Sequence, residues 1–203
     1  MVVSFEDLAS NPGVLYTRTT DDSFVVVDLT SPILSQVDIS SSNGADSTKA
    51  SAGDTITVSI TASEPITPPN VTIAQSHADV ISEVTGSKRR SYTASFTLTQ
   101  SFSGDEGMCG VAIYFEDTAS NAGATHRTVT SGHKVMIDMT VPTLPRVNIV
   151  ASNSADATRA NVGDRITLSI TASEQILEPV VTIATQLATV SSSGATSWVA
   201  AYT

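Results

Sequence analysis

Basic residues are scarce in this chain of 203 residues. Ten Lys and Arg stand against 20 Asp and Glu, which gives a formal net charge of −10. Nucleic-acid binding needs a basic surface, so this balance argues against nucleic acid as a partner. It suits solubility and the binding of divalent cations instead. The sequence also has no run of about 18 apolar residues, so we expect no direct membrane insertion of this segment.

A single cysteine, Cys109, excludes a disulfide within the chain. It lies in the apolar, strand-like stretch 108–115, and we expect it to be a small buried hydrophobic residue. Long helix-forming runs are missing as well. Val and Ile are abundant in the 40% apolar fraction, and Ser and Thr dominate the remainder. This composition favours strands and is typical of an extracellular all-β protein.

The chain contains an internal repeat with an offset of 110 residues. Residues 53–64 read Gly-Asp-Thr-Ile-Thr-Val-Ser-Ile-Thr-Ala-Ser-Glu, and residues 163–174 read Gly-Asp-Arg-Ile-Thr-Leu-Ser-Ile-Thr-Ala-Ser-Glu. Of the 47 positions from 31 to 77, 26 are identical to those 110 residues further on. A period of this size suits a whole sandwich domain, because the repeats of solenoids are only about 20–50 residues long.

The repeat divides the chain into one complete unit and two partial ones. Residues 31–140 are the complete unit, residues 1–30 match its last two strands, and residues 141–203 match its first five. Near the end the offset falls to 106, because 198–203 matches 92–97, which indicates a four-residue deletion in a loop. Strands cut from their sheet would stay unpaired, so we expect a longer parent protein in which neighbouring repeats supply the partners. The alternative is that a neighbouring molecule in a head-to-tail filament supplies them.

The complete unit has the pattern of a seven-stranded sandwich. Residues 55–62 alternate Ile56, Val58 and Ile60 with Thr and Ser, which is the period of a half-buried strand. The other strands are expected at 36–40, 71–74, 80–84, 92–99, 110–115 and 125–130, with a further run at 133–138. Short strands between Gly, Pro and Asn turns predict an all-β, immunoglobulin-like Greek-key β-sandwich. The expected principal strand residues are Ile56, Val58, Ile60, Tyr92, Phe96, Ile113 and Phe115, and no helix longer than two turns is expected within 50–116.

Three motifs resemble the bacterial immunoglobulin-like tandem repeats of large cell-surface adhesins. They are the linker Val27-Asp-Leu-Thr-Ser-Pro32 with its copy 137–142, the Gly-Asp-x-Ile-Thr strand, and the turn Phe-Glu-Asp-x-Ala-Ser-Asn-x-Gly. The resemblance covers essentially the whole chain. It implies sandwich domains in tandem that act as stalks, some of them stiffened by calcium at domain junctions. This chain differs from the common turn by having Ser10 and Ser120 where glycine is frequent.

A calcium site is also predicted from the expected topology. In this fold the loops after the second and sixth strands lie at one end of the sandwich, where the incoming linker also arrives. Calcium takes six to eight oxygen ligands from carboxylates, amides and carbonyls. The acidic and amide residues gathered at this end are Asp28, Glu64, Glu116, Asp117 and Asn121, and the equivalent set at the next junction begins with Asp138 and Glu174. The alternative is that Asp117 and Asn121 only hydrogen-bond their own turn and that Asp28 caps a strand end.

Other motifs are weaker. Asn70-Val71-Thr72 is an N-glycosylation sequon, although the repeat has Val180 in place of Asn70. Residues 131–134, Ser-Gly-His-Lys, have the spacing of a serine–lysine nucleophile pair but lack its companion motifs, so we interpret the match as chance. The three histidines lack metal-ligand spacing. No combination of nucleophile, base and orienting group is present, and an enzyme is not expected.

Two functions follow as hypotheses. The first is a non-enzymatic extracellular spacer or stalk in a cell-surface adhesin, in contact only with neighbouring repeats and calcium. The second is a building block of an extracellular filament or sheath, in which copies of the chain also make lateral contacts. A longer parent with lectin-like domains would favour the first, and ordered packing in a fibre would favour the second.

Overall fold

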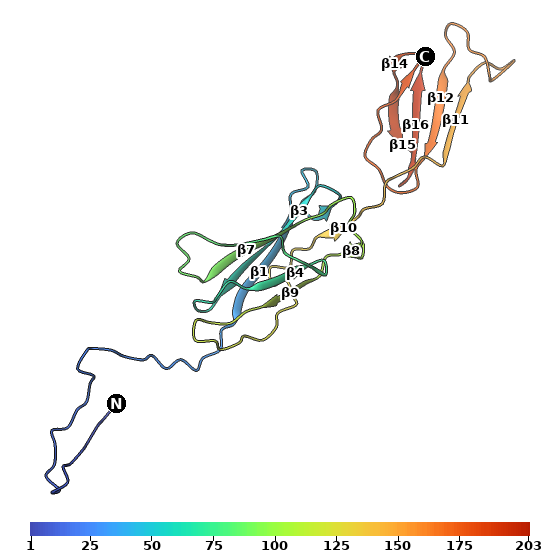
Figure 1. The fold of residues 1–203 in the computed structure, drawn as a ribbon. Helices are drawn as coiled ribbons and strands as arrows, with labels where there is room; N and C mark the ends of the chain where they lie inside the picture. The colour runs from blue at the N-terminus through green and yellow to red at the C-terminus, as the bar shows by residue number, and fades with distance from the viewer. The chain divides into compact units, whose positions relative to one another are not determined.

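The computed structural model describes residues 1–203 and contains strands, turns and loops but no helix. The chain forms two compact units, Met1–Met139 and Thr140–Thr203. Both are built mainly from antiparallel strands (Figure 1). The prediction of an all-β protein is therefore confirmed, as is the absence of a long helix within 50–116. No helix in the chain is long and apolar enough to cross a membrane.

One sheet of unit 1 has four antiparallel strands in the order β1-β3-β7-β6. The strands are β1 (Leu34–Ser41), β3 (Thr55–Ala62), β7 (Ser91–Thr97) and β6 (Val80–Glu83). The predicted bounds of β3 agree with the structure, and those of the other three differ by at most two residues. β3 alternates between buried Ile or Val and more exposed Thr or Ser, so only one face of this sheet is apolar.

Two shorter sheets complete unit 1. The first has the order β5-β4-β9, with β5 (Ser76–His77), β4 (Asn70–Ile73) and β9 (Val111–Tyr114). In the second, β10 (Met136–Ile137) lies between β2 (Lys49–Ala50), to which it is parallel, and β8 (Gly107–Met108), to which it is antiparallel. The sequence did not predict β2, β5 and β8, because two-residue strands carry no readable alternation.

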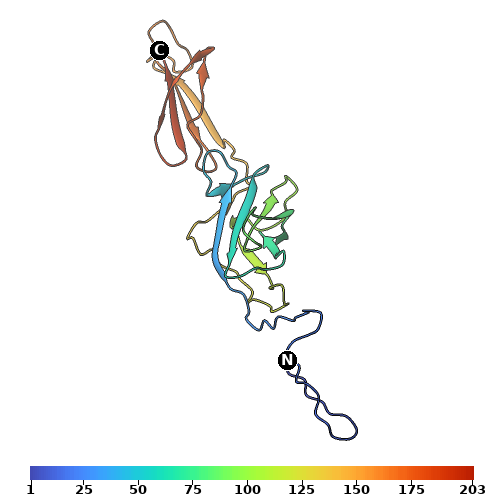
Figure 2. The same cartoon turned by 90° about the vertical axis from the view of Figure 1, so that its left-hand side faces the viewer.

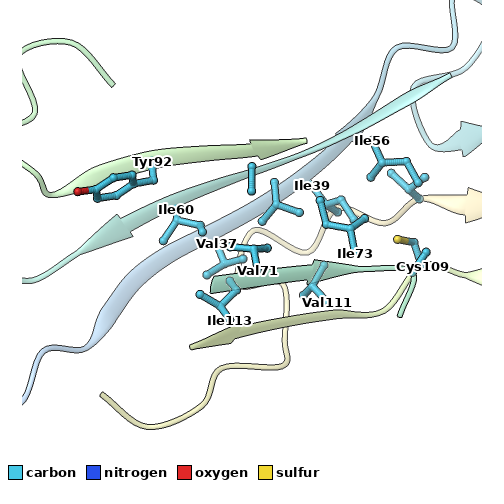
Figure 3. Close-up of a cluster of buried hydrophobic side chains, with 14 of the residues drawn as sticks. Val37, Ile39, Ile56, Ile60, Val71, Ile73, Tyr92, Cys109, Val111 and Ile113 are labelled. Carbon is cyan, nitrogen blue, oxygen red and sulfur yellow. The ribbon is translucent and has the colours of Figure 1, made fainter. Parts of the chain in front are cut away.

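The hydrophobic core lies between the four-stranded sheet and the β4–β9 pair. Figure 3 shows Ile39, Ile56 and Ile60 directed toward Val71, Ile73 and the two labelled residues of β9. Of the seven expected principal strand residues, six are buried and Phe96 is partly buried against the same cluster. This arrangement is that of a β-sandwich, in which two apolar faces cover one another.

Cys109 is buried and free, as the sequence predicts. It lies between β8 and β9 and belongs to the core cluster (Figure 3). Burial raises the pKa of its thiol to about 11, so the thiol is protonated at neutral pH. Cys109 therefore acts as a packing residue rather than as a reactive thiol.

The expected strand at 125–130 is wrong as a regular strand. His126 makes a single antiparallel bridge to Ile113 of β9. Four residues later, the Thr130 amide donates to the Val37 carbonyl of β1 over 2.9 Å, and the Thr130 hydroxyl accepts from the Val37 amide over 2.8 Å. The segment thus leaves β9 and reaches β1 in the opposite layer, so it cannot form a ladder with either strand. The run 133–138 is likewise reduced to β10, because Gly132 adopts φ +81° and turns the chain before it.

Unit 2 repeats the strand register of unit 1. Its four-stranded sheet has the order β11-β12-β16-β15, with β11 (Arg146–Ala151), β12 (Ile166–Thr171), β16 (Ser197–Tyr202) and β15 (Thr189–Ser192). Ile149 pairs with Leu168 as Ile39 pairs with Val58, which is the same register at an offset of 110. The remaining strands of unit 2 are β13 (Thr182–Ile183) and β14 (Gln186–Leu187), which form a hairpin. Figure 2 shows the strands of unit 2 in the orange and red colours of the C-terminal part of the chain.

The predicted four-residue deletion is divided between two places. Ile81 pairs with Ala94, and Val190 pairs with Ala200 in the equivalent position. The offset is therefore 109 at β15 and 106 at β16. One residue is lost between β14 and β15, and three are lost in the turn that follows β15. The interpretation of a deletion in one loop was wrong, because the alternation of β15 is too short to fix its register from sequence.

Tyr92 combines a core position with a buried hydrogen bond, which generates a prediction. Its hydroxyl donates to the Ile66 carbonyl over 3.0 Å, and both residues are buried. In Tyr92→Phe that carbonyl stays buried without its partner, so unit 1 should lose about 1–3 kcal/mol of unfolding free energy in urea denaturation. Tyr114→Phe is the control, because the Tyr114 hydroxyl is bonded only to the exposed Arg127. An equal effect of both substitutions would contradict the assignment.

Candidate functional site

The candidate site begins with the turn that follows β9. Asp117 is buried, and its Oδ1 accepts the amides of Ala119 and Asn121, each over 2.8 Å. Its Oδ2 accepts the side-chain amide of Asn121 over 2.8 Å. An aspartate that bonds the backbone two and four residues ahead fixes a tight turn without help from other elements. The predicted turn role of Asp117 and Asn121 is therefore present.

The charge on Asp117 is stabilised by the turn that it organises. Burial raises the pKa of this carboxyl group. The hydrogen bonds from the side chain and backbone of Asn121 and from the amides of Ala119 and Ser120 outweigh burial, so the pKa lies below its ordinary value. Asp117 is consequently an anion at neutral pH, although its side chain is covered.

Two further residues of the turn have special backbone or steric requirements. Ser120, found where glycine is frequent in similar repeats, adopts φ +67°, a conformation that glycine enters at lower cost. Gly123 lies against the ring of Phe115, because a Cβ built on it would approach that ring to 2.3 Å. The aromatic ring and the turn therefore pack against one another at the end of β9.

The same turn recurs at 5–13 with the same geometry. Asp7 accepts the amides of Ala9 and Asn11 and the side-chain amide of Asn11, and Ser10 adopts φ +66°. The flanking bridges, Val3–Tyr16 and Glu6–Pro12, stand 110 residues before Ile113–His126 and Glu116–Ala122. Residues 1–30 form these bridges but no regular strand, so the expected last two strands of a repeat are present only as an isolated turn.

An acidic cluster lies beside the turn of unit 1. Asp28, Glu64 and Asp117 each bring a carboxylate oxygen within 4.8 Å of the others. Asn121 holds Asp28 to the turn, because its side-chain amide also donates to the Asp28 carbonyl over 3.0 Å. The sequence predicted that these four residues come together, although Asp28 and Asn121 are 93 positions apart.

The spacing of the cluster is compatible with one calcium ion. Calcium binds oxygen at about 2.3–2.6 Å, so two ligands of one ion stand at most about 5 Å apart. Asp28, Glu64 and Asp117 satisfy that limit and supply three of the six to eight oxygens needed. Asp117 keeps a lone pair on Oδ2, which accepts only the Asn121 side chain. The donor set therefore fits calcium in type and spacing, with the other ligands left to water or carbonyls.

The remaining predicted site residues take different positions. Glu116 is exposed and outside the cluster, and its carbonyl accepts the Thr67 amide over 2.9 Å. The amide of Asp138 donates to the Ala50 carbonyl over 2.9 Å in unit 1. Glu174 is half-buried in unit 2, with Oε1 covered and without a hydrogen-bond partner. Asn70 is exposed at the start of β4, where its side chain is accessible to a modifying enzyme.

A second polar cluster was missed by the sequence analysis. Asp38 Oδ1 accepts the Ser131 hydroxyl over 2.6 Å and lies 2.7 Å from His133 Nδ1. Both partners are more than 90 positions from Asp38, and no spacing in the sequence connects them. Ser131 and His133 bind the same carboxylate oxygen, so the hydroxyl is bonded to the acid rather than to the imidazole. This order differs from the Ser–His–Asp order in which the imidazole activates the hydroxyl.

The close packing of Gly123 on Phe115 generates a prediction. In Gly123→Ala the added methyl group has no space, because Phe115 is held in the core. We expect a loss of about 1–3 kcal/mol of unfolding free energy in thermal denaturation. Gly13→Ala is the matched control, since its neighbour Phe5 is exposed and lies outside the core cluster. Equal losses in the two variants would contradict a role for core packing.

Asp38 generates a prediction on pH. The Ser131 hydrogen bond holds the pKa of Asp38 below its ordinary value of 3.8, against the raising effect of burial and with smaller help from His133. A carboxyl group with a lowered folded pKa stabilises the protein above its unfolded pKa, and this stability is lost as pH falls through the folded pKa.

Wild type should therefore be more stable than Asp38→Asn at about pH 6, and the difference should shrink below about pH 4. Urea unfolding of both proteins across this range measures it. A difference that is independent of pH would show that Asp38 acts without its charge.

Comparison of the chain with protein-family models, with curated protein sequences and with solved structures found no match in any of the three. What can be said of function therefore rests on the repeated strand register and on the acidic cluster beside the Asp117 turn.

Proposed function

We propose that this chain is a non-enzymatic structural segment of a large extracellular protein, in which immunoglobulin-like Greek-key sandwiches in tandem act as a spacer or stalk. The observation that carries the proposal is the recurrence of one strand register at an offset of 110 residues. A spacer is built from units that fold through their own internal contacts and can be repeated in series. Such a segment works at the cell surface and contacts neighbouring repeats.

The positions that recur are those that hold the fold. Gly53 and Gly163 both have positive φ, and Ile60 and Ile170 are both buried at equivalent places in their sheets. The Ile33 carbonyl accepts the Ser63 amide over 2.9 Å, and the Thr143 carbonyl accepts the Ser173 amide over the same distance. The contacts that hold the fold are expected to repeat when natural selection acts on the length and shape of each unit. The resemblance to repeats of bacterial adhesins supports the same interpretation.

We further propose that Asp28, Glu64 and Asp117 bind one calcium ion. Three carboxylates within 4.8 Å repel one another, by roughly 1 kcal/mol per pair in water at about 4 Å and by more where they are partly covered. A divalent cation converts that repulsion into attraction and ties the Asp28 segment to the loops at this end of unit 1. Asp138 and Glu174 are the equivalents of Asp28 and Glu64, and Asn70 is proposed as a surface glycosylation site.

A building block of an extracellular filament or sheath is the second candidate. It is favoured by two apolar residues that unit 1 leaves exposed on paired strands, Met108 on β8 and Met136 on β10. Exposed apolar side chains on neighbouring positions of a sheet are a contact surface for another chain. Lateral packing between copies distinguishes this candidate from a spacer.

The spacer role is tested by replacing residues 31–140 in the parent protein with an unrelated sandwich of equal length. Cells that express either form should bind their surface targets equally, because only the length matters. Antibodies against residues 31–140 should label intact cells that express the natural protein. A loss of binding on replacement would mean that this unit contacts a target itself.

Calcium binding predicts a change in thermal stability. An ion that binds only the folded state stabilises unit 1 by about 2.7 kcal/mol when its concentration is a hundred times the dissociation constant. The melting temperature should therefore rise in calcium relative to chelator. The rise should be absent in Asp28→Asn and Glu64→Gln, which remove the charge but keep the shape.

Glu116→Gln is the control, since Glu116 is exposed and outside the cluster. It should keep the full response to calcium. A melting temperature of the wild type that is the same in calcium and in chelator would leave the three acids as turn and capping residues.

A further inference from the structure

Asn70 of β4 and Tyr114 of β9 are direct neighbours across the two strands, which Figure 1 shows side by side. Directly opposed residues of an antiparallel pair project from the same face of the sheet, with Cβ atoms about 4.5–5.5 Å apart. The next pair along, Val71 and Ile113, is buried in the core. Asn70 and Tyr114 therefore lie on the outer face, where Asn70 is exposed and Tyr114 is 45% exposed.

An open groove of about 400 Å³ lies beside this pair. Binding sites for drug-sized ligands have volumes of about 300–1,000 Å³, so this groove has room for a small group such as one sugar ring. Asn70 and Tyr114 both line it, and the other lining residues include Thr67, Pro68, Glu116 and Thr125. A group attached to the Asn70 side chain would therefore lie at the groove rather than in open solvent.

The walls of the groove are held in place by contacts within unit 1. The Arg127 guanidinium donates to the Tyr114 hydroxyl over 3.1 Å, which fixes the outer end of the ring. The Glu116 carbonyl accepts the Thr67 amide over 2.9 Å and ties the loop before β4 to the end of β9. Because these contacts exist without a ligand, little conformational entropy is lost when a group enters the groove.

The chemistry of the lining fits a sugar ring. One face of a pyranose carries C–H groups with a small positive charge, and the π face of a Tyr ring is negative, so the two faces attract one another. Around its rim the sugar has hydroxyl and amide groups that need hydrogen-bond partners. The exposed Glu116 carboxylate accepts such hydrogen bonds, and the exposed Thr125 hydroxyl both donates and accepts them.

Asn70 offers the attachment point. It is the only asparagine of the chain with Ser or Thr two positions later and no Pro between them. In glycosylation its Nδ2 atom bonds to the anomeric carbon of a sugar carried on a lipid diphosphate. The nitrogen loses one proton, and the lipid diphosphate leaves. The sugar on Asn70 is then held directly opposite Tyr114 in the strand register.

The pair is not part of the recurring scaffold. At the offset of 110 residues, Val180 stands in place of Asn70, and Ser4 stands in place of Tyr114. Residues that hold the fold, such as Ile60 and Ile170, recur. An exposed aromatic ring opposite the one sequon of the chain therefore indicates a role that is specific to unit 1.

We propose that the first sugar of a glycan on Asn70 packs its apolar face on the ring of Tyr114 and fills the groove. The contact rests on the glycosylation of Asn70 proposed above and goes beyond it, because it makes the glycan part of the folded unit. β4 and β9 have only four residues each. A sugar that is bonded to one strand and packed on the other joins the two, so it stabilises the folded state of unit 1.

The test compares two preparations of the 203-residue chain. One is secreted by eukaryotic cells that add N-glycans and is trimmed enzymatically to the first N-acetylglucosamine, and the other is made in bacteria without N-glycosylation. Peptide mass spectrometry should find the sugar on Asn70. In calorimetry, unit 1 of the chain with the sugar should melt about 2–6 °C higher, since the contact exists only in the folded state. The melting of unit 2, followed by the fluorescence of the single tryptophan Trp198, should be unchanged.

Substitutions at Tyr114 test the contact itself. In Tyr114→Ala the difference between the two preparations should disappear, and in Tyr114→Phe, which keeps the ring, it should remain. Met108→Ala is the matched control, because Met108 is also an exposed strand residue but does not line the groove. It should keep the full difference. Each variant is compared with and without the sugar, so the direct effect of the substitution on stability cancels.

Three results would overturn the contact, and they separate it from the glycosylation proposal. A secreted chain without a sugar on Asn70 would refute both. Wild-type preparations that melt at the same temperature, or an equal gain in Tyr114→Ala, would refute the contact and leave Asn70 as a glycosylated surface residue. The spacer and calcium proposals are tested separately and would stand in each case.

Discussion

The structure depends on the burial of one alternating apolar face against another. β3 supplies Ile56, Val58 and Ile60, and the opposite layer supplies Val71 and Ile113, all fully or almost fully covered. Each such side chain contributes about 1.5–3 kcal/mol when it leaves water. Strands β2, β8 and β10 are too short to be stable alone and are ordered only because this core holds the segments that contain them.

The Asp117 turn places charge at the end of that core. A buried carboxylate is tolerated there because three hydrogen bonds within the turn satisfy it, and the same side chain of Asn121 reaches the Asp28 carbonyl. Local turn chemistry thus determines which residues of distant segments meet. The Asp117 carboxylate cannot move away without leaving the amides that it accepts without a hydrogen-bond partner. The turn therefore holds Asp117 in the acidic cluster with or without a bound ion.

The sequence was most informative where alternation is long and where the chain repeats. β3 was predicted to the residue, and the grouping of Asp28, Glu64 and Asp117 followed from the positions of loops in a sandwich. The failure at 125–130 has a physical cause, since Thr130 bonds to β1 and takes the chain out of the β9 layer. The Asp38–Ser131–His133 cluster could not be predicted either. It depends on that same crossing, which no local pattern encodes.

The two units show that burial belongs to the surroundings of a residue as much as to its type. Ile39 pairs with Val58 and Ile149 pairs with Leu168 in the equivalent register, yet Ile39 is covered and Ile149 is exposed. The sequence specifies the strands and their pairing locally, through alternation. It specifies the closed core only when the second layer is available.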